Sequence, residues 1–180
     1  MDVGEVIAGA VTPLRSEEDL DLDGEVVYAV NYGGWDVQVA DVLFTGAISP
    51  GSVSSLNVPD LDDDPYTWSG IEDVAYYNVY NLNPDSLLVD FIVEPGTEYR
   101  LQLIIYEPYY VTQGYRRINL IVNGEMVVRE LDTHTTTTAK GLVYTLDLTP
   151  EDDLLTIEVE GASSGDQYSI LNGLTLEANP

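Results

Sequence analysis

The sequence predicts an all-β protein, an antiparallel β-sandwich of the jelly-roll type. The first observation is an alternation with a period of two: Leu101, Leu103 and Ile105 are separated by single residues, the spacing that places side chains on one face of a strand. The second is the set of turn sequences between such segments, of which Asn123 followed by Gly124 is typical of a two-residue hairpin. The third is that no helical period is sustained for three turns.

Strand-forming residues begin after residue 24. Val26 to Val30 is a β-branched and aromatic run that stops at the turn sequence Asn31 to Gly34. Residues 41–72 contain several prolines and glycines, and we expect loops with little regular structure there. Further strands are expected at about 74–80, 87–93, 98–106, 115–122, 125–131, 141–148, 154–160 and 168–177.

The length of the chain sets the domain organisation. The 180 residues, of which 44% are hydrophobic, are enough to bury one core, so one domain is predicted. Residues 25–180 form the predicted sandwich, and residues 1–24 are interpreted as an acidic N-terminal extension with room for one edge strand. We expect a monomer or a module of a larger protein.

The charge balance is strongly acidic. The chain has 32 Asp and Glu residues against 6 Lys and Arg, a net charge of -26, which makes nucleic acids and anionic membrane surfaces poor partners because like charges repel. Three interpretations of the acidity stay open: adaptation to a high-salt, halophilic habitat, binding of divalent cations, and the solubility of an exported acidic protein. No apolar run approaches the roughly 18 residues of a membrane span, so no membrane insertion is expected.

One acidic segment resembles half of a calcium loop. Asp19, Asp21 and Asp23 alternate ahead of Gly24, as carboxylates do in the first half of such a loop. The bidentate glutamate expected at its twelfth position is replaced by Val30. The sequence therefore suggests Ca2+ as a possible ligand of these residues but predicts no required cofactor.

Aromatic side chains follow the strand at 98–106. Tyr109 and Tyr110 suit the flat apolar face of a sugar ring with hydroxyls at its rim, although one of the two rings can instead pack inward beneath the loop. Asp166 and Gln167 offer hydrogen-bonding groups for sugar hydroxyls. The alternative is that Asp166 only stabilises a turn. Trp68 lies in a polar region as either a core residue or a second sugar platform.

With these segments placed, the chain resembles the malectin and malectin-like domains, jelly-roll carbohydrate-binding modules with a galactose-binding-like fold. The resemblance spans roughly residues 25–178. It rests on Tyr28 to Gly34, Tyr99 to Glu107, Val122 to Gly124 and Ile170 to Leu174, in that order.

The resemblance implies a set of contact residues at one end of the sandwich. Tyr109 and Tyr110 match the family's paired aromatics, and Asp166 matches an aspartate that bonds sugar hydroxyls. Two further aromatics are implied, one at Tyr66 or Trp68 and one at Tyr76, Tyr77 or Tyr80. The resemblance therefore implies an extracellular or cell-surface module that binds a neutral oligosaccharide or polysaccharide.

Two functions other than glycan binding are compatible with the sequence. Glu107 and Asp166 raise the possibility of a glycosidase pair, but carboxylates are abundant here, and we interpret Glu107 as a structural residue that bonds backbone groups beside the aromatic loop. No enzyme activity is expected. The alternative is a calcium- or salt-stabilised adhesion or scaffolding domain that binds protein, which would spread its tyrosines through the core rather than gather them with Asp166.

Overall fold

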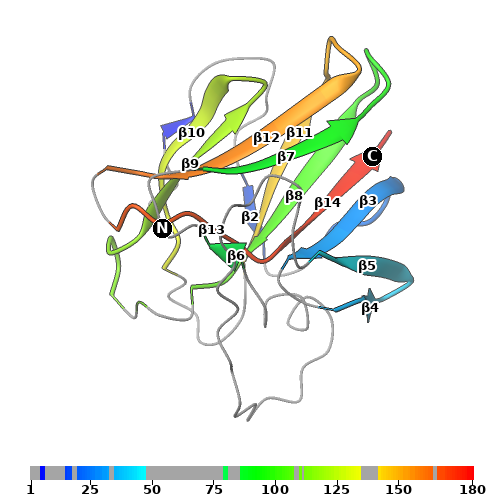
Figure 1. The fold of residues 1–180 in the computed structure, drawn as a ribbon. Helices are drawn as coiled ribbons and strands as arrows, with labels where there is room; N and C mark the ends of the chain where they lie inside the picture. Colours follow the sequence, from blue (N-terminus) through cyan, green and yellow to red (C-terminus); the bar gives the residue numbers. More distant parts are fainter. Residues whose placement is uncertain are drawn as a thin grey trace.

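The fold is an all-β sandwich in a computed structural model of the chain, as Figure 1 shows. The structure describes residues 5–6, 15–17, 20–32, 35–47, 79–80, 86–107, 110, 112–134, 142–163 and 166–180. Within these residues every regular element is a strand, and none is a helix. The predicted fold class is confirmed.

One layer is a five-stranded sheet with the strand order β1-β10-β9-β12-β7. All of its pairings are antiparallel. Its strands are β1 (Glu5–Val6), β7 (Leu87–Ile92), β9 (Arg117–Val122), β10 (Glu125–Asp132) and β12 (Leu154–Gly161).

The other layer is a seven-stranded sheet with the order β2-β11-β8-β14-β3-β5-β4. A short pair, β6 (Val79–Tyr80) with β13 (Ile170–Leu171), forms a separate two-stranded sheet. The strands of the larger sheet are β2 (Arg15–Glu17), β3 (Glu25–Tyr32), β4 (Val37–Val39), β5 (Val42–Ala47), β8 (Tyr99–Ile105), β11 (Leu142–Leu148) and β14 (Gly173–Ala178).

The core lies between the two sheets. Leu101, Leu103 and Ile105 of β8 and Leu155 and Ile157 of β12 belong to one buried cluster, and each is at most 1% exposed. The period-2 spacing puts these residues on the inner faces of the sheets because successive strand side chains alternate. Burial of this apolar surface is the main force that holds the layers together.

The outer face of the seven-stranded sheet is also covered. A second apolar cluster joins Ile104 of β8 to Phe44 of β5, both fully buried. Beside it, the amide side chain of Gln102 exchanges two hydrogen bonds with the backbone of Asp21, at 2.8 and 2.6 Å. The segment before β3 is therefore fastened across the sheet, and β8 is buried on both faces.

The predicted hairpin turn is confirmed. β9 and β10 pair from Val122 with Glu125, and the two residues between them have positive φ, 49° at Asn123 and 79° at Gly124. This is the conformation that the Asn-Gly sequence favours.

The prediction of an irregular region at 41–72 is wrong for its first part. Val42 to Ala47 is strand β5, which runs parallel to β3 and makes this sheet mixed. The tight turn into β5 has a positive φ of 49° at Ala40. Alanine is not a residue typical of turns, so the sequence does not predict this turn.

The N-terminal extension contributes to both layers. β1 pairs with β10 at the edge of the five-stranded sheet, and β2 pairs with β11 at the edge of the seven-stranded one. In the part of the chain that the structure describes, no helix has the length and hydropathy needed to cross a membrane.

Candidate functional site

Three segments that are distant in the sequence meet at one end of the sandwich. Glu107 follows β8, Arg116 precedes β9, and Asp166 lies between β12 and β13. Arg116 and Asp166 form an isolated parallel β-bridge, and the backbone N–H of Asp166 donates to the carbonyl of Tyr115 at 2.7 Å. The backbone therefore fixes where these side chains can reach.

A buried ion pair forms the base of the site. Nη1 of Arg116 lies 2.8 Å from Oε2 of Glu107, and the two side chains are 4% and 1% exposed. The hydroxyl of Thr133 contacts the same Glu107 oxygen at 3.4 Å, and Oε1 of Glu107 accepts the backbone N–H of Tyr110 at 3.2 Å. The interpretation of Glu107 as a structural residue that bonds a backbone group beside the aromatic loop is confirmed.

Above this base, Tyr110 and Asp166 are joined directly. The hydroxyl of Tyr110 donates to Oδ2 of Asp166 at 2.7 Å, and Nη2 of Arg116 reaches the same oxygen at 3.2 Å. The hydrogen bond to Asp166 is the largest cause that raises the pKa of Tyr110, with smaller contributions from burial and from the nearby carboxylate charge. Tyr110 is therefore held as a neutral donor.

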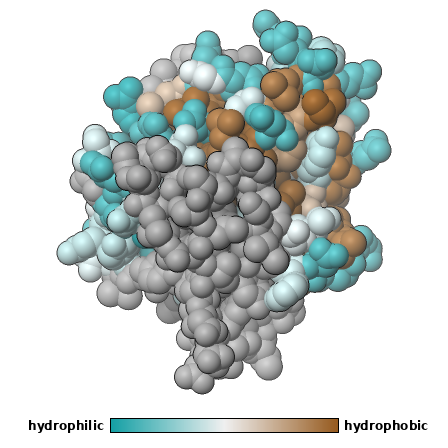
Figure 2. All heavy atoms as spheres, in the orientation of Figure 1, coloured by the Kyte–Doolittle hydropathy of each residue, from teal (hydrophilic) through white to brown (hydrophobic). Residues whose placement is uncertain are grey.

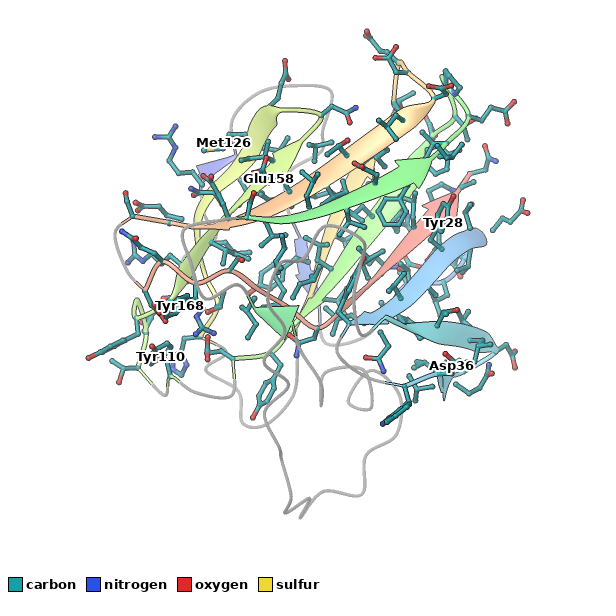
Figure 3. All side chains as sticks on the ribbon, in the orientation of Figure 1. Tyr28, Asp36, Tyr110, Met126, Glu158 and Tyr168 are labelled. Carbon is teal, nitrogen blue, oxygen red and sulfur yellow. The ribbon has the colours of Figure 1, made fainter. Side chains whose placement is uncertain are left out.

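The ring of Tyr110 is packed as well as hydrogen-bonded. Tyr115 stacks on it with a centroid separation of 5.0 Å and an interplanar angle of 21°, and the Arg116 guanidinium also lies over it at 5.0 Å. Tyr115 is 57% exposed. The pair presents an aromatic surface to solvent beside an acidic side chain, and Figure 3 places Tyr110 and Tyr168 at this end.

Some predicted site residues come together and others cannot be placed. Tyr110 and Asp166 are in contact, and Gln167, next to Asp166, is exposed. Other tyrosines lie in the core, among them Tyr32, Tyr99 and Tyr144. The remaining predicted aromatics, Tyr66, Trp68, Tyr77 and Tyr109, lie outside the described residues.

Sequence reasoning did not single out Tyr115 or Arg116 as members of the site. Gly114 directly before Tyr115 was the available signal: it has a φ of 80° and turns the chain into β9. The pairing of Arg116 with Asp166, 50 residues away, has no counterpart in any local pattern.

Of the predicted calcium-loop residues, Asp21 is paired with an arginine. A carboxylate oxygen of Asp21 lies 2.6 Å from Nη1 of Arg100, Asp23 is exposed, and Asp19 lies outside the described residues. Within those residues no three acidic, histidine or cysteine side chains are grouped as a metal site. Burial raises the pKa of Glu177, whose carboxylate accepts the Gly24 N–H at 3.1 Å beside this segment.

Comparison of the sequence with known proteins gives one informative relative. The chain is 29% identical over 117 residues to Malectin-A of Xenopus laevis, a match that covers 62% of this chain and 40% of Malectin-A. No protein-family model matches the chain.

Ectodomains of plant receptors are similar to this chain in structure. The extracellular domain of ANXUR1 from Arabidopsis thaliana superposes with a TM-score of 0.66 at 14% identity, covering 86% of this chain and 49% of that one. A chain from the complex of the plant peptide RALF23 with FER and LLG2 gives 0.69 at 15% identity, covering 85% and 48%. This chain thus spans about half the length of these neighbours, and the likeness concerns the fold.

Proposed function

We propose that this chain is a malectin-like domain and acts as a non-catalytic module that binds a neutral oligosaccharide or polysaccharide where Tyr110, Tyr115 and Asp166 meet. The observation that carries the proposal is the arrangement of Asp166. Among the described residues, both side-chain contacts of Asp166 use Oδ2, and in the proposal Oδ1 accepts sugar hydroxyls.

The chemistry of the site favours a neutral sugar. Tyr115 supplies an exposed apolar ring for stacking, and Asp166 next to it supplies a charged acceptor. The net charge of -26 disfavours acidic polysaccharides because both partners would be anionic. One or two stacked rings with a few hydrogen bonds correspond to dissociation constants on the order of micromolar to millimolar.

We extend the proposal to location and to catalysis. The ANXUR1 neighbour is an extracellular domain, and a location outside the cell suits a glycan-binding module. A hydrolytic role is not supported by the carboxylate pair considered above, because Glu107 and Asp166 are bridged by one guanidinium instead of flanking an open cleft.

A glycan array tests the proposal. Wild-type protein, screened in high salt with and without Ca2+, is expected to bind one class of neutral glycans. Binding should be lost in Tyr115→Ala, in Asp166→Asn and in the double variant of Tyr109 and Tyr110 to alanine. Trp35→Ala is the matched control, because Trp35 is 71% exposed and lies outside the site. A folded wild-type protein that binds no neutral glycan would contradict the proposal.

A further inference from the structure

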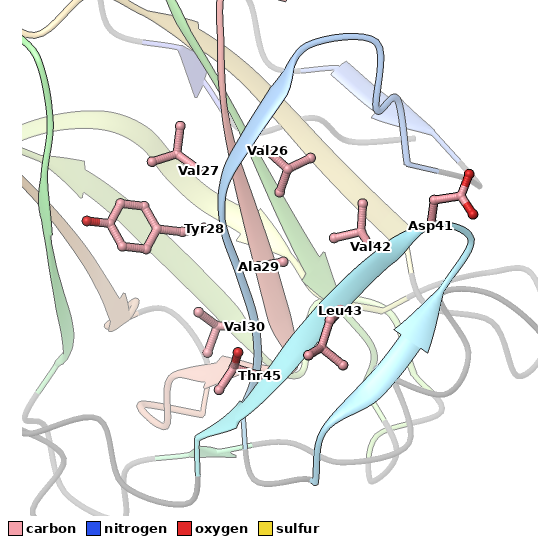
Figure 4. A pocket seen from close by; sticks show the side chains of 9 residues that line it. All are labelled: Val26, Val27, Tyr28, Ala29, Val30, Asp41, Val42, Leu43 and Thr45. Carbon is pink, nitrogen blue, oxygen red and sulfur yellow. The ribbon is translucent and has the colours of Figure 1, made fainter.

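The parallel strands β3 and β5 pair over only three residues. Their register runs from Val30 with Thr45 to Tyr32 with Ala47. On the N-terminal side of this contact the strands diverge and enclose an open space of about 570 Å3, the β3–β5 wedge, between residues 26–30 and 41–45. Figure 4 shows the two strands apart with mostly apolar side chains around the space.

A β-bulge accounts for the divergence. On its other edge β3 pairs Tyr28 with Leu176 and Val26 with Glu177, so Val27 is an extra residue in the ladder to β14. A bulge bends its strand and increases the local twist, which turns this end of β3 away from β5. β5 does not follow β3, because its other edge pairs antiparallel with β4.

Backbone groups on both walls point into the wedge. The N–H of Gly46 donates to Asp36 on the β4 side, so by alternation the backbone of Leu43 faces β3. The N–H of Tyr32 donates to Asn172 on the β14 side, so the N–H of Ala29 faces β5. Among the described residues, neither Leu43 nor the N–H of Ala29 has a ladder partner on that side.

The side chains do not protect these edges. Exposed strand edges usually carry lysine, proline or inward charges that prevent pairing. Here Val27 and Leu43 are 43% and 55% exposed. Among the described residues that line the space there is no Lys or Arg, and Asp41 is the one charged residue. In Figure 2, hydrophobic atoms gather on the right-hand side of the molecule, where β3 and β7 lie in Figure 1.

The β3 wall is anchored to the opposite sheet through Tyr28. The ring of Tyr28 packs on Phe91 of the opposite sheet with centroids 4.8 Å apart, and its hydroxyl donates to the carbonyl of Ile92 at 3.2 Å. A strand that enters the wedge would therefore meet an edge that is already ordered, which lowers the entropic cost of association.

We propose that the β3–β5 wedge binds an extended peptide segment of a partner protein by strand addition, with apolar residues at alternate positions and Lys or Arg at its ends. A strand is the one element whose backbone satisfies two facing edges at once. The net charge of -26 and Asp41 favour cationic ends. This surface is separate from the sugar site, since Tyr110 lies on the opposite side of the molecule from Tyr28 in Figure 3.

The test uses a synthetic seven-residue peptide of alternating valine and threonine with a lysine at each end. Because the backbone supplies the attraction, this generic sequence is expected to bind at micromolar to millimolar concentration and to slow amide hydrogen exchange at Ala29 and Leu43. The same peptide with alternate amides N-methylated loses about two hydrogen bonds and should bind about tenfold more weakly.

Two protein variants separate charge from folding effects. Asp41→Lys should weaken binding of the lysine-ended peptide, whereas Asp152→Lys, an equal charge change at an exposed residue outside the wedge, should have a much smaller effect. Absence of binding, equal binding of the methylated peptide, or protection at other amides would overturn the proposal. Concentration-dependent protection of Ala29 and Leu43 without peptide would also overturn it and would identify a second copy of the chain as the occupant.

Discussion

The hydroxyl of Tyr110 donates a 2.7 Å hydrogen bond to Asp166, a residue 56 positions later in the chain. This bond ties the loop after β8 to the loop between β12 and β13. The bond therefore fixes the position of the Tyr110 hydroxyl relative to the Asp166 carboxylate.

The first prediction concerns the ionisation of Tyr110. Since the bond to Asp166 is the main cause that raises the pKa of Tyr110, Asp166→Asn should lower that pKa toward its ordinary value. Ultraviolet titration of phenolate formation measures this, with Tyr110→Phe identifying the transition. Burial raises the pKa of Tyr144 to about 12, which keeps its ionisation separate. An unchanged titration curve in Asp166→Asn would refute the assigned bond.

The same shift predicts a stability effect. A tyrosine with a raised folded-state pKa stabilises the fold fully below its unfolded pKa of about 10, and this contribution is lost as pH rises through the folded value. Wild-type protein should therefore lose more unfolding free energy above pH 10 than Tyr110→Phe does, as measured by urea denaturation across that range.

The second prediction compares two adjacent arginines. Arg116→Met leaves the Glu107 carboxylate buried without its cation and should cost about 3–5 kcal/mol of unfolding free energy. Arg117→Met is the matched control: Arg117 and its partner Glu130 are 31% and 40% exposed, so the loss should stay below about 1 kcal/mol. Denaturant titration of both variants measures the difference, and equal losses would show that the buried pair does not stabilise the fold.

The third prediction concerns the buried carboxylate of Glu177. Burial raises its pKa, so ionisation destabilises the fold as pH rises above the unfolded value of about 4.5. Glu177→Gln should weaken the pH dependence of unfolding between pH 4 and 7. The variant also loses one of the hydrogen bonds from Gln102 and Gly24, a cost that is constant with pH and does not alter the slope. Identical slopes for the two proteins would contradict the shift.

The fourth prediction contrasts two glycines. A Cβ at Gly161 would lie 2.0 Å from the carbonyl oxygen of Gln167, so Gly161→Ala must displace the segment that carries Asp166 and should abolish glycan binding. A Cβ at Gly124 would meet nothing within 4 Å, and Gly124→Ala should cost only about 1–2 kcal/mol through its positive φ. Glycan affinity and unfolding free energy, measured together, distinguish a displaced site from a weaker fold.

The fifth prediction concerns salt. At a net charge of -26 the acidic side chains repel one another in the folded state. NaCl screens this repulsion and should therefore raise the unfolding free energy. Because Arg100 already neutralises Asp21, CaCl2 at equal ionic strength should add nothing further. A calcium-specific gain that disappears in Asp23→Asn would instead establish the predicted calcium loop.

The sequence predicted the strands that local patterns determine. β8, β9, β10, β11 and β12 appear within two residues of their expected bounds, because alternation and turn chemistry are local. β5 was missed because its turn uses Ala40, and its parallel pairing with β3 depends on contacts that no local pattern encodes. In the same way Asp166 was singled out but Arg116 was not, since their contact depends on the assembled sandwich.

The buried guanidinium of Arg116 divides the candidate site into two tiers. It pairs with both Glu107 and Asp166, whereas Tyr115 and Gln167 are exposed and lie outside these ion pairs, with Tyr115 stacked on the ring of Tyr110. Under the proposed function, substitutions at these exposed positions are therefore expected to change ligand preference more than they change the stability of the fold. A protein engineer who wants new specificity from this scaffold would randomise the exposed positions and leave the ion-paired tier unchanged.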